Sequence, residues 1–260
     1  MTPPRPDPTA GLTRRDLLRF AAQGAAGVVV SQSLIACASD RLTGAAAPDA
    51  PRADAAAAGP SCVITAPLIE GPFFVDERLQ RTDIRSDPAT RAVVAGVPLS
   101  LRFNVSRVAS RACAPLAGAY VDLWHASPAG AYSDEASEGT LGKKHLRGYQ
   151  VTDARGVAQF LTVYPGWYPG RSVHVHFKLR LFAGARATYE FTSQAFFDEV
   201  LTSAVHARPP YSTRGERDTH NADDFYYTSL TPPERAALTL RATRGVSGYA
   251  GVINLGVQVG

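Results

Sequence analysis

The sequence lacks a large excess of charge of either sign. Its 27 Lys and Arg residues exceed its 23 Asp and Glu residues by only four. The basic residues are scattered along the chain and seldom alternate with aromatic residues that would be exposed. Because a nucleic-acid-binding surface needs clustered positive charge, this composition argues against a nucleic-acid partner. With 45% hydrophobic and 19% charged residues, the chain has the composition of a globular protein.

Long helical patterns are also scarce. Apolar residues instead alternate in short runs that are broken by turn residues, which is typical of strands. The predicted strands cover residues 98–108, 119–126, 146–153, 156–163, 172–181, 237–244 and 249–260. Helix is expected only as a turn or two within residues 193–205. Strands at this spacing without helices between them predict an all-β fold, an antiparallel β-sandwich in a single domain.

The apolar run near the start of the chain is too short and too polar for a stable membrane span. It reads AAQGAAGVVVSQSLIA over residues 21–36 and contains two glutamines and two serines. The run follows Arg14 and Arg15 in TRRDLLRF, a pattern that resembles a twin-arginine export signal. Export would place the protein outside the cytoplasm.

The sequence LIAC, residues 34–37, resembles a bacterial lipobox and predicts a lipid-modified Cys37. The alternative is cleavage at a small-residue site further on, in the alanine-rich stretch. On the first interpretation residues 1–37 form the signal, and the only membrane contact is a lipid anchor. The protein would then lie on the outer side of the cytoplasmic membrane, in the periplasm or at the cell surface.

Cysteine is rare, with three residues in the chain. If Cys37 is acylated, Cys62 and Cys113 remain, and an oxidising compartment favours a disulfide between them. Two buried thiols are the alternative. Residues 38–60 are rich in Ala, Pro and Asp without a sustained apolar face, which predicts a disordered tether. The folded domain is therefore expected to cover residues 61–260.

Two histidines stand two residues apart in HVHFKL, at positions 174 and 176. On a strand, His174 and His176 point to the same face, and two adjacent imidazoles are a common way to bind a metal. Tyr168 precedes them in the turn YPGWYPG. A phenol has a pKa near 10, so it binds as phenolate only to a strongly Lewis-acidic cation such as Fe(III). Alternatively, Tyr168 with Tyr164 and Trp167 covers one end of the core.

Three segments together resemble the intradiol ring-cleavage dioxygenases, non-haem iron(III) enzymes that open catechols between their two hydroxyl groups. The segments are VDLWHASPAGAYSD, LRGYQVTDARGVAQFLTVYPGWYPGRSVHVHFKL and TSQAFFDE. The resemblance is closest to short secreted members and extends from EGPFF, residues 70–74, to the C-terminal strands.

The resemblance implies one Fe(III) per chain and a set of ligands that bind it. These ligands are Tyr132, Tyr168, His174 and His176. It also places Arg171 and Gln194 beside the substrate and gives Tyr168 a second role as an internal base. The implied partners are a catechol-type substrate and O₂, and the implied product is a cis,cis-muconate-type diacid.

The sequence departs from the cytoplasmic catechol and protocatechuate enzymes in two respects. The segment between Tyr168 and His174 is shorter, and no helical dimerisation segment precedes the sandwich. The substrate ring and the oligomeric state therefore stay open.

Two other functions are compatible with parts of the pattern. TDARGVAQFLTVYPGWY also resembles transthyretin-like and adhesin-type sandwich modules, which would make the protein a non-catalytic binding module at the cell surface. A zinc hydrolase could use His174 and His176 with Asp198 or Glu199, although zinc rarely needs phenolate ligands. The remaining histidines are expected to be structural. They are His125, His145, His206 and His220.

Overall fold

The computed structural model describes residues 63–109 and 112–259. The predicted export signal and tether, with Cys37 and Cys62, lie outside the described residues. Cys113 is disulfide-bonded, and its pairing with Cys62 stays a prediction. Among the described residues, the structure has no helix with the length and apolar character needed to cross a membrane.

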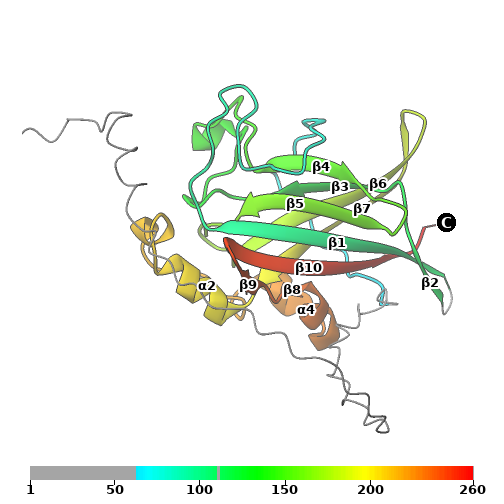
Figure 1. Cartoon of the computed structure of the whole chain (residues 1–260). Coiled ribbons are helices and arrows are strands. Elements are labelled where there is room, and N and C mark those ends of the chain that lie inside the picture. Colours follow the sequence, from blue (N-terminus) through cyan, green and yellow to red (C-terminus); the bar gives the residue numbers. More distant parts are fainter. Residues whose placement is uncertain (1–62, 110–111, 260) are drawn as a thin grey trace, which may run out of the picture. The chain divides into compact units, whose positions relative to one another are not determined.

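Two five-stranded sheets form a sandwich (Figure 1), which confirms the predicted all-β fold. The first sheet contains β2 (Ala112–Pro115), β1 (Pro98–Ala109), β10 (Gly248–Val257), β9 (Thr243–Gly245) and β5 (Val157–Val163). The second contains β4 (Arg147–Val151), β3 (Tyr120–Trp124), β6 (His174–Ala183), β7 (Arg186–Phe197) and β8 (Thr239–Leu240).

Each sheet is mixed and not purely antiparallel as predicted, because one strand pair in each runs parallel. These pairs are β1 with β10 and β7 with β8, while the other pairs are antiparallel. Parallel strands need a long crossover connection. The helical segment that follows β7 supplies this length before the chain returns to β8.

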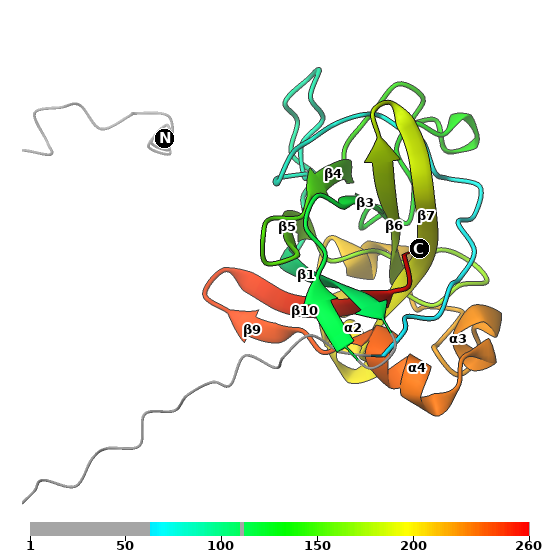
Figure 2. The same cartoon turned by 90° about the vertical axis from the view of Figure 1, so that its right-hand side faces the viewer.

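Three short helices gather on one side of the sheets (Figure 2). They are α2 (Glu199–His206), α3 (Phe225–Ser229) and α4 (Pro232–Leu238). The turn or two of helix expected within residues 193–205 is α2, which begins after β7 ends at Phe197 and is capped by Asp198. The strand predicted over residues 237–244 is wrong at its start, where α4 extends to Leu238. Prolines at the first two helical positions favour α4 there.

The alternation of side chains along β6 determines which face of the sheet carries His174 and His176. Val175, Phe177 and Leu179 are at most 1% exposed and belong to the core between the sheets. His174 and His176 have the opposite orientation because side chains alternate along a strand. The two imidazoles are therefore on the outer face of the second sheet.

Residues 66–77 form a strap across this outer face, running beside β6 and β7 (Figure 2). The backbone N–H of Leu68 donates to Thr192 O, and Gln194 Nε2 donates to Ile69 O. Further along, Glu70 pairs with Lys178 and Asp76 pairs with Arg180. Since Lys178 and Arg180 continue the alternation of His174 and His176, one face of β6 presents the imidazoles and also fixes the strap.

Candidate active site

Four side-chain atoms that can donate a lone pair to a metal, two phenol oxygens and two imidazole nitrogens, form a continuous series beneath the strap. They are called the four donor atoms below. The hydroxyl of Tyr132 lies 3.4 Å from that of Tyr168, which lies 3.1 Å from His174 Nε2. His174 Nε2 in turn lies 3.0 Å from His176 Nε2. The structure therefore brings together the two phenols and two imidazoles that are separated by up to 44 positions in the sequence.

Burial keeps these four groups uncharged. Tyr132 is 1% exposed, and desolvation raises its pKa well above the ordinary value. Desolvation likewise raises the pKa of Tyr168, which is partly exposed. It lowers the pKa of His174 to about 3 and that of His176 well below the ordinary value. Neutral imidazoles are the form that binds metals, whereas buried phenols lose their protons only beside a strong Lewis acid.

The donor set fits a single hard cation. His174 Nδ1 donates to Ser172 O at 2.7 Å, which directs the lone pair of Nε2 toward the other donor atoms. His176 reaches the other donor atoms through Nε2. Its Nδ1 is buried without a hydrogen-bond partner among the described residues. Ligand atoms about 2 Å from a shared cation lie about 3 Å from one another, which is the spacing of neighbouring atoms in this series.

Register explains why His176 faces two particular side chains. In the second sheet, His176 is opposite Trp124 of β3 and opposite Gln194 of β7. The indole of Trp124 stacks on the His176 ring, with centroids 5.0 Å apart and an interplanar angle of 10°. Gln194, the neighbour of His176 on β7, is completely buried.

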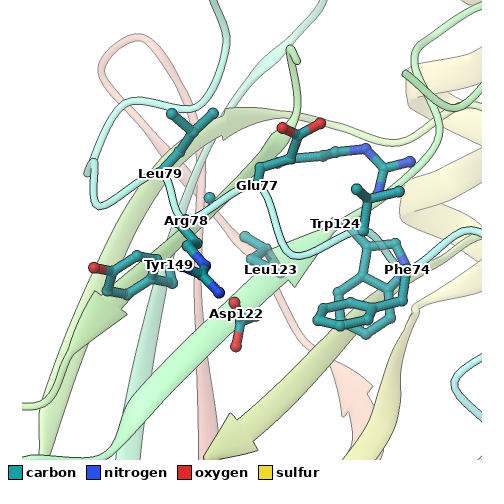
Figure 3. A pocket seen from close by; sticks show the side chains of 11 residues that line it. Phe74, Glu77, Arg78, Leu79, Asp122, Leu123, Trp124 and Tyr149 are labelled. Atoms are coloured by element: carbon teal, nitrogen blue, oxygen red, sulfur yellow. The ribbon is translucent and has the colours of Figure 1, made fainter. Parts of the chain in front are cut away.

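The strap adds aromatic rings to the site. Phe73 stacks on Tyr132 with ring centroids 4.3 Å apart, and Phe74 packs on Trp124 at 4.9 Å. Figure 3 shows Phe74 and Trp124 side by side at a cavity of about 10 Å³, which has room for about one water molecule. The strap therefore packs closely on the sheet and shields the phenol of Tyr132 from solvent.

A buried arginine links the strap to the loop that carries Tyr132. Arg147 is 3% exposed, and its Nη1 donates to Phe73 O at 2.5 Å. Its Nε donates to Ser133 O and Oγ, beside Tyr132. Desolvation lowers the pKa of Arg147, while the nearby Glu77 carboxylate opposes that shift.

The two residues that were predicted to contact the substrate, Arg171 and Gln194, lie beside the four donor atoms. Arg171 Nη2 donates to Gln194 Oε1 at 2.5 Å. The guanidinium also lies over the ring of Tyr226, 4.5 Å from its centroid. Arg171 Nε donates to Asp224 Oδ2 at 2.8 Å. Arg171 and Gln194 are thus one connected pair at the edge of the site.

The other predicted residues have different surroundings. Asp198 accepts from Leu201 N as the cap of α2, and Glu199 pairs with Arg217. His125 contacts Thr162 Oγ1 at 2.7 Å. Within residues 63–109 and 112–259, no three His, Cys, Asp or Glu side chains form a metal-binding group. The geometry therefore does not support a zinc site built from His174, His176 and a carboxylate.

Several site residues were not identified by the sequence reasoning. They are Asp224, Trp124, Phe73 and Arg147. Trp124 lies in the segment VDLWHASPAGAYSD, and Phe73 lies in EGPFF, but neither segment indicates that these rings pack on His176 and Tyr132. Asp224 precedes Phe225 in DDFYY, which indicates a helix cap and gives no sign of a partner 53 positions away.

Comparison with known proteins identifies the family of the chain. A family model described as Dioxygenase matches residues 69–201. The chain is 30% identical over 139 residues to a chlorocatechol 1,2-dioxygenase of Pseudomonas putida, covering 45% of this chain and 48% of that protein. It is 35% identical over 104 residues to a protocatechuate 3,4-dioxygenase beta chain of Burkholderia cepacia, covering 36% of this chain and 44% of that protein. These matches span about half the length of the curated relatives.

A solved structure of an intradiol ring-cleavage dioxygenase from Tetranychus urticae is similar over a larger region. It has a TM-score of 0.65 and 26% identity, and the match covers 76% of this chain and 95% of that chain. The β-sandwich is thus shared with a solved ring-cleavage dioxygenase. The chain belongs to the intradiol ring-cleavage dioxygenase family.

Proposed function

We propose that this protein is a non-haem iron dioxygenase that cleaves a catechol-type ring between its two hydroxyl groups. The observation that carries this proposal is the series of two phenol oxygens and two imidazole nitrogens with steps of 3.0–3.4 Å. Family membership supports the same reaction class. The expected product is a cis,cis-muconate-type diacid that contains both atoms of O₂, as in the catabolism of aromatic compounds.

The proposed metal ligands are the four side chains of the series, Tyr132, Tyr168, His174 and His176. Bound Fe(III) would withdraw electron density from a coordinated catecholate and make its ring reactive toward O₂. Two phenolates suit this hard cation better than zinc or magnesium. The two neutral imidazoles need no deprotonation before they bind.

Tyr168 is the proposed internal base. It is partly exposed, whereas Tyr132 is 1% exposed and covered by Phe73, so an incoming substrate reaches Tyr168 more readily. A catechol that binds as a dianion must lose two protons, and the Tyr168 oxygen can accept one of them. Arg171 lies close enough to oppose the rise in the pKa of Tyr168 that desolvation causes.

Arg171 and Gln194 are proposed to bind and orient the substrate. A fixed guanidinium stabilises negative charge that develops on the ring during the reaction. The Gln194 amide is held at both ends, by Arg171 Nη2 and by Ile69 O, so its orientation is set before substrate binds. Such preorganisation avoids a reorganisation cost during the reaction.

A non-catalytic transthyretin-like or adhesin-like module is not favoured. Such a module would not require four metal-binding side chains to converge in a buried group. Export by the twin-arginine route and anchoring through Cys37 stay predictions, because their residues lie outside the described part of the chain.

The test is a visible absorption spectrum of the purified protein with iron quantified on the same sample, before and after anaerobic addition of catechol. The proposal expects about one iron per chain, a phenolate-to-iron charge-transfer band, and a shift of that band when catechol binds. A screen of catechols with O₂ then identifies the cleaved ring from its diacid product. A colourless protein after reconstitution with iron would overturn the proposal.

A further inference from the structure

A carboxylate outside the four donors links the site to the helical segment. Asp224 is completely buried and immediately precedes α3. Its Oδ2 accepts hydrogen bonds from Arg171 Nε at 2.8 Å, Ser172 N at 2.9 Å and Ser172 Oγ at 3.1 Å. Its Oδ1 accepts from Tyr226 N at 2.8 Å and Tyr227 N at 3.1 Å. Oδ2 thus binds Arg171 and Ser172 at the edge of the site, and Oδ1 caps α3.

The contacts with Asp224 complete a fixed environment for one guanidinium. Arg171 Nε meets Asp224, Nη2 meets Gln194, and the Tyr226 ring lies 4.5 Å below the guanidinium carbon. Tyr226 is itself held by its backbone N–H to Asp224. A guanidinium is planar and keeps its donors in a rigid fork, so these contacts restrict its orientation.

Charge balance gives a second reason for the carboxylate. The side chain of Arg171 is 14% exposed and that of Asp224 is 0% exposed. A buried cation without a partner is strongly unfavourable, so an unpaired Arg171 side chain would tend to turn toward solvent. The ion pair allows the guanidinium to stay beside Gln194 and the four donor atoms.

We propose that Asp224 is a positioning residue for Arg171: it fixes the guanidinium beside the substrate and balances its charge. This inference rests on the proposed ring-cleavage function. Asp224 acts through Arg171 and does not touch the four donor atoms. Since a misplacement of about 1 Å in a positioning group can reduce a rate about 10²-fold, loss of the carboxylate should lower catalysis while the metal ligands stay in place.

Asp224→Asn separates this role from helix capping. Asparagine caps a helix about as well as aspartate, so its one oxygen can still accept from Tyr226 N and Tyr227 N. Its NH₂ group then faces Arg171 Nε and Ser172 N, which are also donors. The substitution removes the charge and breaks the contact with Arg171 specifically. Asp223→Asn is the matched control, because Asp223 is the adjacent residue and is exposed.

The experiment measures iron per chain, the resting visible spectrum, kcat/KM for catechol, and the Kd of the anaerobic catechol complex. For Asp224→Asn we expect wild-type iron content and resting spectrum, a loss of about 10²-fold in kcat/KM, and a weaker catechol complex. Asp223→Asn should match the wild type. An unchanged kcat/KM in Asp224→Asn would overturn the proposal, and so would a loss of activity that only follows a loss of iron.

A crystal structure of metal-free Asp224→Asn provides a test that needs no activity. We expect the Arg171 side chain to leave Gln194, and an unchanged Arg171 would overturn the proposal. If Asp224→Asn does not fold, Asp224→Ser replaces it, because serine keeps a capping oxygen without a carboxylate. A wild-type protein that neither binds iron nor cleaves catechols would reject the proposed function, while this structural test would still decide whether Asp224 positions Arg171.

Discussion

The Nε2 atoms of His174 and His176 lie 3.0 Å apart on one face of β6. Both imidazoles are 2% exposed, and burial keeps both neutral. Two neutral nitrogens this close, with phenol oxygens beside them, gain a common partner if a cation binds between them. The pair is therefore the foundation of the proposed metal centre.

His174→Ala should abolish iron binding. The substitution removes the donor that lies between Tyr168 and His176 in the series. Iron per chain, measured after reconstitution, is expected to fall at least tenfold. His220→Ala is the control, because the His220 side chain is 51% exposed and pairs with Glu199 outside the site. Full iron occupancy in His174→Ala would show that the ligand set is wrong.

Tyr168→Phe should keep some iron but slow substrate binding by tenfold or more, because the proton acceptor is lost. Tyr132→Phe should lose iron more completely, because Tyr132 is 1% exposed and its oxygen is less readily replaced by water. Iron analysis and stopped-flow measurement of anaerobic catechol binding separate the two variants. An unchanged binding rate in Tyr168→Phe would reject its role as a base.

Gly71→Ala should weaken iron binding. Gly71 has φ of +74°, so an alanine there is strained, and its Cβ would be in van der Waals contact with the His176 ring, 3.4 Å from Cε1 and 3.9 Å from Nε2. Relief of that strain would shift the strap against His176. Gly118→Ala is a matched control, because Gly118 has φ of +77° with no atom within 4 Å of an added Cβ. Both substitutions should reduce the free energy of unfolding by about 1 kcal/mol through backbone strain. Only Gly71→Ala should also reduce iron affinity in a metal titration, and equal affinities would contradict this.

Stability should fall on acidification, partly through His206. Burial lowers the pKa of His206 to about 4, and Arg217 acts in the same direction while Glu199 opposes it. Between about pH 6.5 and pH 4 the unfolded chain binds a proton here that the folded protein does not. The contribution of His206 to the free energy of unfolding is therefore complete above pH 6.5. It declines by up to about 3 kcal/mol as the pH falls to 4 and is constant below that.

His206→Gln tests the acid effect, because an amide N–H can still reach Pro165 O, the present partner of Nε2 at 3.0 Å. Denaturant unfolding from pH 7.5 to pH 4 should show a smaller loss of stability in this variant than in the wild type. His125, whose pKa burial also lowers to about 4, keeps part of the dependence in both proteins. The same pH dependence in His206→Gln and wild type would count against the assignment.

The strand pattern predicted the fold class and the face of β6 that holds the site. Alternation of side chains is a local property, so His174 and His176 had to share a face once residues 172–181 formed a strand. The sequence was less informative for β7. Its residues after Ser193 combine apolar and polar side chains in an order that also suits a helix, and only pairing with β6 makes Arg186–Phe197 a strand.

What the sequence by itself determined is which chemical groups are available: two tyrosines and two histidines in motifs that resemble one family, with Arg171 and Gln194 nearby. Tertiary structure decided how these groups are supported. The strap places Phe73 on Tyr132, and the segment after β7 places Asp224 on Arg171. Local periodicity fixes the direction of a side chain, but contacts between distant segments depend on strand register and on the path of the chain, which no short stretch of sequence contains.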